Sequence, residues 1–307
     1  MKILITGGSG MVGKNLNHAL TYYKYTILSP SKKQLNLKNI NKVKSYLKKN
    51  KPDIIIHLAS LVGGIQANID NPVDFLQENL IINLNIIKAA NECNVRNFLN
   101  IASSCMYPKN IKSNLKEGML LSGKLEETNE GYALSKITAM KLCEYISSKK
   151  NRFYKTLIPC NLYGKYDNFK ESSSHLVAAT IKKIHKAKIR KHKFVKIWGD
   201  GKARREFLFV SDFVKFILFA IKNFRKIPTI MNIGTGKDFT IKNYYKFTAD
   251  VIKYEGKFKF DKKRPVGMKR KLLDISYQKK FNWFPKTEIN EGIRQTYKFY
   301  LKEYEKK

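Results

Sequence analysis

The chain has 307 residues, and its 60 Lys and Arg against 24 Asp and Glu give a formal net charge of +36. Hydrophobic residues make up 43% and aromatic residues 12%, which provides enough apolar surface for a large core and excludes a wholly disordered chain. No apolar run reaches the roughly 18 residues that a membrane-spanning helix needs. We therefore predict a cytoplasmic protein of one large domain or two ordinary ones, with no membrane partner.

The positive charge is spread along the whole chain. Lysine pairs occur at 32–33, 48–49, 182–183 and 262–263, and no nucleic-acid-binding motif accompanies them. We interpret the charge as a solvated cationic surface that favours an anionic ligand such as a nucleotide. A nucleic-acid footprint is the alternative, and we expect no nucleic-acid partner.

The four cysteines show no metal-binding pattern. They are Cys93, Cys105, Cys143 and Cys160, with no CxxC pair and no His/Cys spacing typical of a zinc site. In a cytoplasmic chain they are expected to be reduced thiols. We predict no metal site.

Short apolar segments alternate with helical patterns through the first half of the chain. In chain order, we predict strands at 1–6, 25–28, 52–59, 97–102 and 155–159, and helices at 14–23, 40–49, 79–94 and 132–148. The continuous apolar run at 52–59 is typical of a parallel sheet that is covered on both faces. The alternation predicts an α/β fold with a doubly wound parallel sheet.

The pattern becomes less regular after residue 165. Strands at 207–210 and 231–234 are expected to return to the sheet, and helices are expected near 242–253 and 290–304. We predict two domains. Residues 1–165 with about 207–240 form a Rossmann nucleotide-binding domain, and about 166–206 with 241–307 form a smaller C-terminal α/β domain for the substrate.

A glycine motif follows the first strand and opens the first helix. Gly7 permits a tight turn, Gly10 lets the backbone approach a pyrophosphate, and Gly13 allows close packing of helix on strand. The helix N-terminus favours the anion. The spacing GxxGxxG differs by one residue from GxGxxG, but the strand, turn and helix context predicts dinucleotide binding. The alternative is a purely structural turn.

The end of the second strand carries no acidic residue. NAD-binding folds commonly place Asp or Glu there to hold the ribose 2′-hydroxyl. This chain has Ser29, Pro30, Ser31, Lys32 and Lys33 instead. Hydroxyl and ammonium groups suit a 2′-phosphate, so the segment favours NADP over NAD, although a solvated lysine turn would look the same.

A phenol and an ammonium lie four residues apart in the predicted helix at 132–148. Tyr132 and Lys136 therefore share one helix face, where the ammonium is expected to lower the phenol's pKa and support proton exchange with a carbonyl. Ser103 and Ser104 follow a predicted strand at its carboxyl end, where ligands of open α/β sheets bind. A hydroxyl there can bond the same substrate oxygen.

Further segments share short patterns of small, aromatic and charged residues. They are 57–65, 103–109, 128–132, 161–164, 167–169, 174–175, 198–199, 205–208 and 270–274. With the glycine and YxxxK motifs, they make the chain resemble the extended short-chain dehydrogenase/reductase family. More narrowly, the chain resembles the GDP-L-fucose synthase family, and this resemblance runs nearly from end to end.

The resemblance implies a catalytic set of five residues. Tyr132 would protonate the C4 oxygen as hydride arrives from NADPH, Lys136 would bind the nicotinamide ribose, and Ser103 would orient the ketone. Cys105 and His175 match the base and acid of 3,5-epimerisation, in which the ketone acidifies the C3 and C5 protons. Nothing in the sequence shows that the Cys105 thiol has the lowered pKa that a base needs.

The resemblance also implies binding residues and partners. NADP(H) would contact Gly7, Gly10, Met11, Val12, Gly13, Ser31, Lys32, Leu58, Ala59, Lys136, Asn161, Leu162 and His175. A GDP-linked 4-keto-6-deoxy sugar would contact Ser104, Cys105, Asn161, Lys183, Trp198, Arg205 and Lys271. A homodimer would form through a four-helix bundle built from the helices at 79–94 and 132–148.

Two departures from the family pattern border the expected sugar site. Lys183 stands where Arg is frequent, which keeps the charge but loses bidentate geometry. Gly131 stands where Pro is usual, so we expect a looser loop before the helix. Three readings follow: a combined epimerase and reductase, a C4 reductase acting on a related hexose or heptose, and a non-catalytic NADP-binding regulator. Intact Ser103, Tyr132 and Lys136 argue against the third.

Overall fold

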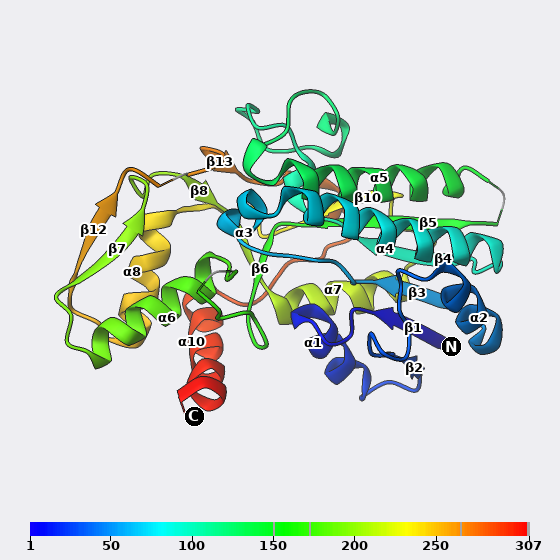
Figure 1. Cartoon of the computed structure of the whole chain (residues 1–307), viewed down its shortest axis with the longest axis horizontal. Helices are drawn as coiled ribbons and strands as arrows, with labels where there is room; N and C mark the ends of the chain where they lie inside the picture. The colour runs from blue at the N-terminus through cyan, green and yellow to red at the C-terminus, as the bar shows by residue number, and fades with distance from the viewer. Residues whose placement is uncertain (150, 172, 265, 306–307) are drawn as a thin grey trace.

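The computed structural model describes residues 1–305 except 150, 172 and 265 (Figure 1). At its centre lies a six-stranded sheet of order β10-β5-β4-β3-β1-β2, in which every pairing is parallel. Its strands are β1 (Lys2–Thr6), β2 (Thr26–Leu28), β3 (Ile54–His57), β4 (Asn97–Ile101), β5 (Phe153–Pro159) and β10 (Ile230–Ile233). The predicted strands of the first half and the one at 231–234 are confirmed.

Helices cover both faces of this sheet. They are α1 (Met11–Leu20), α2 (Ile40–Asn50), α4 (Pro72–Glu92), α5 (Glu130–Ser147) and α7 (Val210–Lys222). Alternate residues of β1 enter different cores: Ile3 packs in the cluster that contains residues of α1 and α7, whereas Leu4 packs in the cluster that contains residues of α2 and α4. The predicted α/β fold with a doubly wound parallel sheet is confirmed.

Helix α4 begins at Pro72, seven residues before the predicted start at 79. Proline is well suited to the first turn, because its missing N–H has no intrahelical partner there. Gly131 lies in the first turn of α5, where an added Cβ would stand 2.8 Å from the carbonyl oxygen of Pro72. The expectation of a looser loop at Gly131 is therefore wrong: glycine permits close contact between α4 and α5.

The predicted return of 207–210 to the central sheet is also wrong. Strand β9 (Phe207–Phe209) pairs with β6 (Asn161–Tyr163) in a separate two-stranded sheet. This pairing joins the end of the β5 segment to the second half of the chain. It places Asn161 beside the segment that contains Arg205.

The second half holds more regular structure than the sequence pattern indicated. Strands β7 (Phe194–Trp198) and β12 (Lys257–Asp261) pair in parallel, and α6 (Leu176–Ile189), α8 (Ile241–Ile252) and α10 (Ile289–Tyr300) pack beside them (Figure 1). A three-stranded sheet joins β11 (Phe239–Thr240), β8 (Arg204–Arg205) and β13 (Arg270–Lys271). The short helices are α3 (Ile65–Asp70), α9 (Ser276–Lys280), η1 (Ser104–Met106), η2 (Glu117–Met119), η3 (Glu127–Asn129) and the π turn η4 (Leu301–Glu305).

Two general features bear on the predicted environment. All four cysteines are free, and three of them are buried. Among the described residues, no helix combines the length and the apolar character that crossing a membrane requires.

Candidate active site

A cavity of about 680 Å³ lies at the carboxyl ends of β1, β3 and β4. Because these strands are parallel and central, their following loops converge at this edge of the sheet. The cavity brings together fourteen of the residues predicted from the sequence. They are Gly7, Gly10, Met11, Val12, Gly13, Lys32, Leu58, Ala59, Ser103, Tyr132, Lys136, Asn161, Leu162 and His175.

The glycine turn forms one wall of this cavity. Gly7 has φ of +72°, and an added Cβ would lie 2.6 Å from the backbone nitrogen of Ala59. A Cβ on Gly13 would lie 2.4 Å from the Gly7 carbonyl oxygen. Gly10 is the N-cap of α1 and provides no side-chain cap, so the helix N-terminus faces the cavity wall without a competing hydroxyl or carboxylate. This cradle suits a pyrophosphate.

The end of β2 has a hydroxyl where an acid is common. Ser29 Oγ accepts a hydrogen bond of 2.9 Å from Asn17 Nδ2, and Lys32 lines the cavity. Lys38 also lines it, in an ion pair with Glu78. Ser31 does not line the cavity: its backbone N–H donates to Gln34 Oε1 at 2.8 Å. Glu78 also lines the cavity but pairs with Lys38, so Lys32, which has no ion pair among the described residues, is the cation here that suits a phosphate.

The predicted phenol and ammonium lie one turn apart on α5. Lys136 Nζ lies 5.7 Å from the centre of the Tyr132 ring and donates a hydrogen bond of 3.1 Å to the Ile101 carbonyl. Burial lowers the pKa of Lys136 to about 8, although the nearby Cys105 opposes this shift. Burial also raises the pKa of Tyr132 above its usual value, while the Ser60 side chain lowers it. The expectation of a lowered phenol pKa is therefore wrong for this structure.

The two serines after β4, Ser103 and Ser104, lie in different surroundings. Ser103 lines the cavity, and its Oγ accepts a hydrogen bond of 3.4 Å from the backbone N–H of Cys105. Ser104 and Cys105 are buried behind it and do not line the cavity. Burial raises the pKa of the Cys105 thiol, and the ammonium of Lys271 is the largest opposing influence. Such a thiol is predominantly protonated at neutral pH.

The loop before α6 forms another wall of the cavity. His175 is the exposed N-cap residue of α6 and lines the cavity together with Asp167 and Asn168. Asp167 is only 4% exposed, and its Oδ2 has no hydrogen-bond partner among the described residues. Burial raises the pKa of Asp167 to about 7. Asp167, Asn168 and Ser60 all lie within segments that carried the resemblance, but none of them was a predicted site residue.

Four of the predicted substrate residues form two pairs outside the lining of this cavity. Lys183 Nζ lies 5.2 Å from the centre of the exposed Trp198 ring. Arg205 and Lys271 are register partners in β8 and β13. Arg264, which the sequence analysis did not identify, also contacts Trp198, with its Cζ 5.0 Å from the ring centre. In the sequence, Arg264 follows two lysines and belongs to no recognisable motif, so the pattern did not distinguish it from a surface cation.

The two register pairs of β8 and β13 differ in their charge partners. Arg204 and Arg270 both bond Asp238, at 2.7 Å and 2.6 Å. The Arg205 guanidinium donates to the backbone carbonyls of Arg204, Met268 and Val266 and, like the ammonium of Lys271, makes no ion pair within the described chain.

Because Arg205 and Lys271 lack the ion pairs that Arg204 and Arg270 form, their burial shifts their pKa values. Burial lowers the pKa of Lys271 to about 8 and that of Arg205 to about 10. The Arg205 charge lowers the pKa of Lys271 further. Glu126 raises the pKa of both groups but forms no ion pair with either, so this second pair is a concentration of positive charge that suits an anion.

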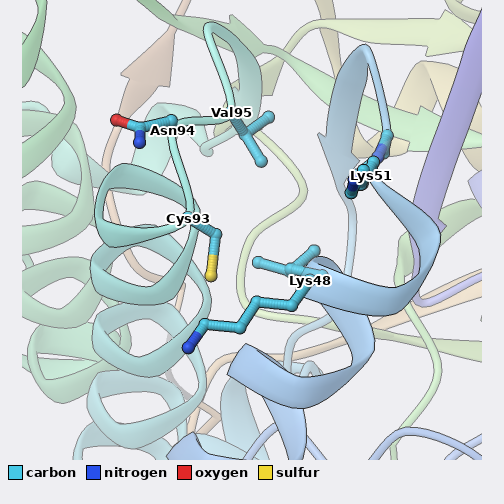
Figure 2. Close-up of a pocket in the computed structure, with 7 residues that line it drawn as sticks. Lys48, Lys51, Cys93, Asn94 and Val95 are labelled. Carbon is cyan, nitrogen blue, oxygen red and sulfur yellow. The ribbon is translucent and has the colours of Figure 1, made fainter.

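A smaller cavity of about 320 Å³ lies between α2 and α4, lined in part by Lys48, Lys51, Cys93, Asn94 and Val95 (Figure 2). Lys51 and Val95 precede β3 and β4, so this cavity lies at the amino ends of the strands. It contains none of the predicted site residues. The Cys93 thiol donates to the Lys44 carbonyl oxygen at 3.8 Å.

Comparisons with known proteins agree with this geometry. Residues 3–234 match the model of the NAD dependent epimerase/dehydratase family. The chain is 50% identical over 304 residues to GDP-L-colitose synthase of Yersinia pseudotuberculosis, covering 99% of each chain. It is 46% identical over 300 residues to GDP-L-fucose synthase of Azorhizobium caulinodans, covering 98% of this chain and 96% of the relative.

A solved structure shows the same likeness. The GDP-mannoheptose C4 reductase from Campylobacter jejuni with NADP bound superimposes with a TM-score of 0.88 and 29% sequence identity, covering 97% of this chain and 98% of that chain. Both the sequence relatives and this structure extend over nearly the full length of the chain. The chain therefore belongs to the NAD dependent epimerase/dehydratase family and, within it, to the group that contains the GDP-L-colitose and GDP-L-fucose synthases.

Proposed function

We propose that this enzyme uses NADPH to reduce the C4 ketone of a GDP-linked 4-keto-6-deoxy sugar and also epimerises C3 and C5, as in GDP-L-fucose synthase. The observation that carries the proposal is that Ser103, Tyr132 and Lys136 line one cavity with the glycine turn. The names of the relatives support the GDP-linked substrate class. Their sugars differ, so the proposal is made for the class.

NADP(H) is the cofactor. The cradle around Gly13 and the N-terminus of α1 would hold the pyrophosphate, and Lys32 would face the 2′-phosphate. Lys136 would bond the nicotinamide ribose with the ammonium that now donates to Ile101. When bound, NADPH supplies the hydride that reduces C4.

Proton delivery would come from Tyr132. The raised pKa keeps its phenol protonated at neutral pH, which is the form that a proton donor needs. Ser103 would donate a hydrogen bond to the same C4 oxygen and fix its position. The Lys136 ammonium, one turn away, would stabilise the phenolate that remains after transfer.

Epimerisation needs a base and an acid on opposite faces of the ring. Cys105 would remove the protons that the C4 ketone acidifies, and His175 would return them from the other face. Burial raises the pKa of the Cys105 thiol, and the Lys271 ammonium is the largest influence that opposes this shift and favours the reactive thiolate.

The nucleotide part of the substrate would bind in the second half of the chain. Arg205 and Lys271 provide charge for the diphosphate, and Trp198 with Lys183 provides a flat surface and a third charge. Asn161 would lie between cofactor and sugar. On this proposal, residues 1–165 with about 207–240 bind NADP(H), and about 166–206 with 241–307 bind the nucleotide sugar.

One observation favours a second candidate, a C4 reductase that acts on a hexose or heptose already epimerised by another enzyme. Cys105 is 4% exposed, does not line the cavity, and has a raised pKa. All three features oppose its use as a base, and none affects reduction by Tyr132. The solved relative named above as a C4 reductase fits this reading.

Turnover in heavy water separates the two candidates. The enzyme would receive GDP-4-keto-6-deoxymannose and NADPH in D₂O, with the product examined by NMR. NADPH consumption with deuterium at both C3 and C5 supports the combined enzyme. Consumption without ring deuterium supports the reductase alone. No consumption with this or any other GDP-linked 4-keto sugar, despite NADPH binding, would contradict both candidates.

We also propose a homodimer that forms through α4 and α5. Leu84 on α4 is 51% exposed and Leu134 on α5 is 41% exposed, whereas Ile87 faces the core of its own chain. Exposed leucines on two adjacent helices are typical of a bundle interface. Light scattering is expected to give twice the chain mass, and Leu84→Arg is expected to give a monomer. We place this enzyme in the cytoplasm, where its four free thiols would stay reduced.

A further inference from the structure

Glu206 is a buried acid at the junction of three segments. It is 1% exposed and lies directly after Arg205. Its Oε1 accepts hydrogen bonds from the backbone N–H groups of Thr235, at 2.6 Å, and Gly236, at 2.7 Å. Its Oε2 accepts one of 2.9 Å from the backbone N–H of Leu273. In all three hydrogen bonds a backbone N–H is the donor, so both side-chain oxygens of Glu206 must act as acceptors.

Three of the segments that contact Glu206 carry or border a proposed substrate residue. Arg205 is its neighbour in sequence, and Leu273 lies two residues after Lys271. The backbone carbonyl of Glu206 accepts a hydrogen bond of 2.9 Å from Asn161 Nδ2. Gly234 leaves room for the carboxylate, because an added Cβ would lie 2.3 Å from Oε1. Residue 206 thus contacts Asn161 of the cavity through its backbone carbonyl and the segment after Lys271 through its carboxylate.

Neither Arg205 nor Lys271 forms an ion pair with a carboxylate among the described residues, although Glu126 lies close enough to raise the pKa of both. Asp238 fixes Arg204 and Arg270 by ion pairs, but Arg205 and Lys271 repel each other and lie side by side because β8 and β13 pair. The bond from the Leu273 N–H to Glu206 ties the end of the β13 segment to the residue that follows Arg205. The Arg205 guanidinium holds the segment before Lys271 through the Met268 and Val266 carbonyls, and the Glu206 carboxylate holds the segment after it.

We propose that Glu206 is a positioning residue that holds Lys271 beside Arg205 so that both charges meet the diphosphate of the substrate. This inference rests on the proposed function, which identifies the bound anion as the diphosphate of a GDP-linked sugar. Glu206 touches neither cofactor nor sugar and acts through the backbone of Leu273. It sets the affinity for the nucleotide sugar and leaves the chemistry at C4 to Tyr132.

Glu206→Gln tests this with a change of one atom. The amide oxygen can keep the bonds to Thr235 and Gly236, but the amide nitrogen would face the Leu273 N–H, donor against donor. Assays run between pH 7 and 8, because burial raises the pKa of Glu206 to about 7 and lowers that of Lys271 to about 8, so that in this window both groups are mostly charged. We expect the Kd for GDP and the KM for the keto sugar to rise about tenfold, with kcat and the Kd for NADPH within about twofold.

Glu117→Gln is the matched control. Glu117 is a partly buried acid that, like Glu206, bonds backbone: its Oε1 accepts a hydrogen bond of 2.8 Å from the N–H of Asn232 in β10. It contacts no proposed substrate residue, so its replacement is expected to leave the Kd for GDP unchanged. A Glu206→Gln protein with unchanged GDP affinity, or with equal losses in kcat, KM and NADPH binding, would overturn the proposal.

Two further variants keep the test decisive. If Glu206→Gln does not fold, Glu206→Asp retains the charge but is too short to reach both Gly236 and Leu273, and the same split between KM and kcat is expected. In the Lys271→Met background, Glu206→Gln should weaken GDP binding far less than it does alone, because its effect passes through Lys271. If the losses of GDP affinity caused by Glu206→Gln and Lys271→Met simply add, Glu206 does not act through Lys271, and the proposal is overturned. GDP binding is read without turnover, so failure of the proposed reaction would not hide the result.

Discussion

The ammonium of Lys136 lies 5.7 Å from the centre of the Tyr132 ring, and both groups line the cavity that the glycine turn borders. Burial acts on the two groups in opposite directions. It holds the phenol in its protonated form and moves the pKa of the ammonium down to about 8. Near neutral pH the pair therefore consists of a proton donor and a cation, which is the combination that carbonyl reduction needs.

Tyr132→Phe removes the proton donor and keeps the ring. We expect kcat for ketone reduction to fall by about 10²- to 10⁴-fold, while the Kd for NADPH changes little. The phenyl ring of the variant can keep the edge contact with Phe75, whose ring centre lies 6.4 Å from that of Tyr132. Tyr145→Phe, on the exposed side of the same helix, should leave both quantities unchanged. A Tyr132→Phe enzyme with near-normal kcat would show that another group delivers the proton.

The pH profile should report Lys136. Its pKa of about 8 lies below the usual value for lysine, so the ammonium is charged below pH 8 and neutral above it. Because the charged form supports Tyr132 and the ribose, kcat at saturating substrate is expected to fall as pH rises through about 8, whereas the loss of charge on Lys271 near the same pH raises KM. Lys136→Arg stays charged at every accessible pH and should lose this decline at a lower overall rate. A wild-type profile that stays flat well above this pKa would disprove the assignment.

Lys271→Met should make the protein more stable and a poorer enzyme. The folded-state pKa of Lys271 is about 8, below the usual value, so burial of the charge costs stability in full below pH 8 and progressively less above it. We expect Lys271→Met to raise the free energy of unfolding at neutral pH by about 1–2 kcal/mol, with the gain shrinking by about pH 10. Urea unfolding at both pH values measures it.

The control for that prediction lies in the same strand. Arg270 bonds Asp238 at 2.6 Å, so Arg270→Met leaves a buried carboxylate with one partner fewer and should lower stability. The two substitutions remove one positive charge each, from adjacent positions. Equal effects on unfolding would mean that net charge, rather than the local partner, decides the outcome.

Gly13→Ala should abolish NADPH binding without unfolding the domain. The new methyl group would stand 2.4 Å from the Gly7 carbonyl oxygen and 2.6 Å from Gly8 Cα, so the turn must open. We expect the Kd for NADPH, followed by its fluorescence, to rise at least about tenfold. Gly118→Ala places its methyl group where no atom lies within 4 Å, and should bind normally. Normal NADPH binding by Gly13→Ala would contradict the assignment of the glycine turn to the cofactor site.

The sequence alone determined the features that depend on short-range patterns. A strand followed by Gly7, Gly10 and Gly13, and a helix with Tyr132 and Lys136 four apart, are local arrangements whose geometry follows from backbone periodicity. The alternation of strands and helices likewise determined the doubly wound sheet, because parallel strands require helical crossovers.

Only the tertiary structure decided the features that depend on burial and on partners distant in sequence. The phenol of Tyr132 and the thiol of Cys105 have raised pKa values because neighbouring elements exclude water, which no local pattern encodes. The pairing of Arg205 with Lys271, and the attachment of Leu273 to Glu206, join segments that the sequence separates widely. The protonation state of a buried group and its hydrogen-bond partners depend on which segments pack around it, and tertiary packing decides this.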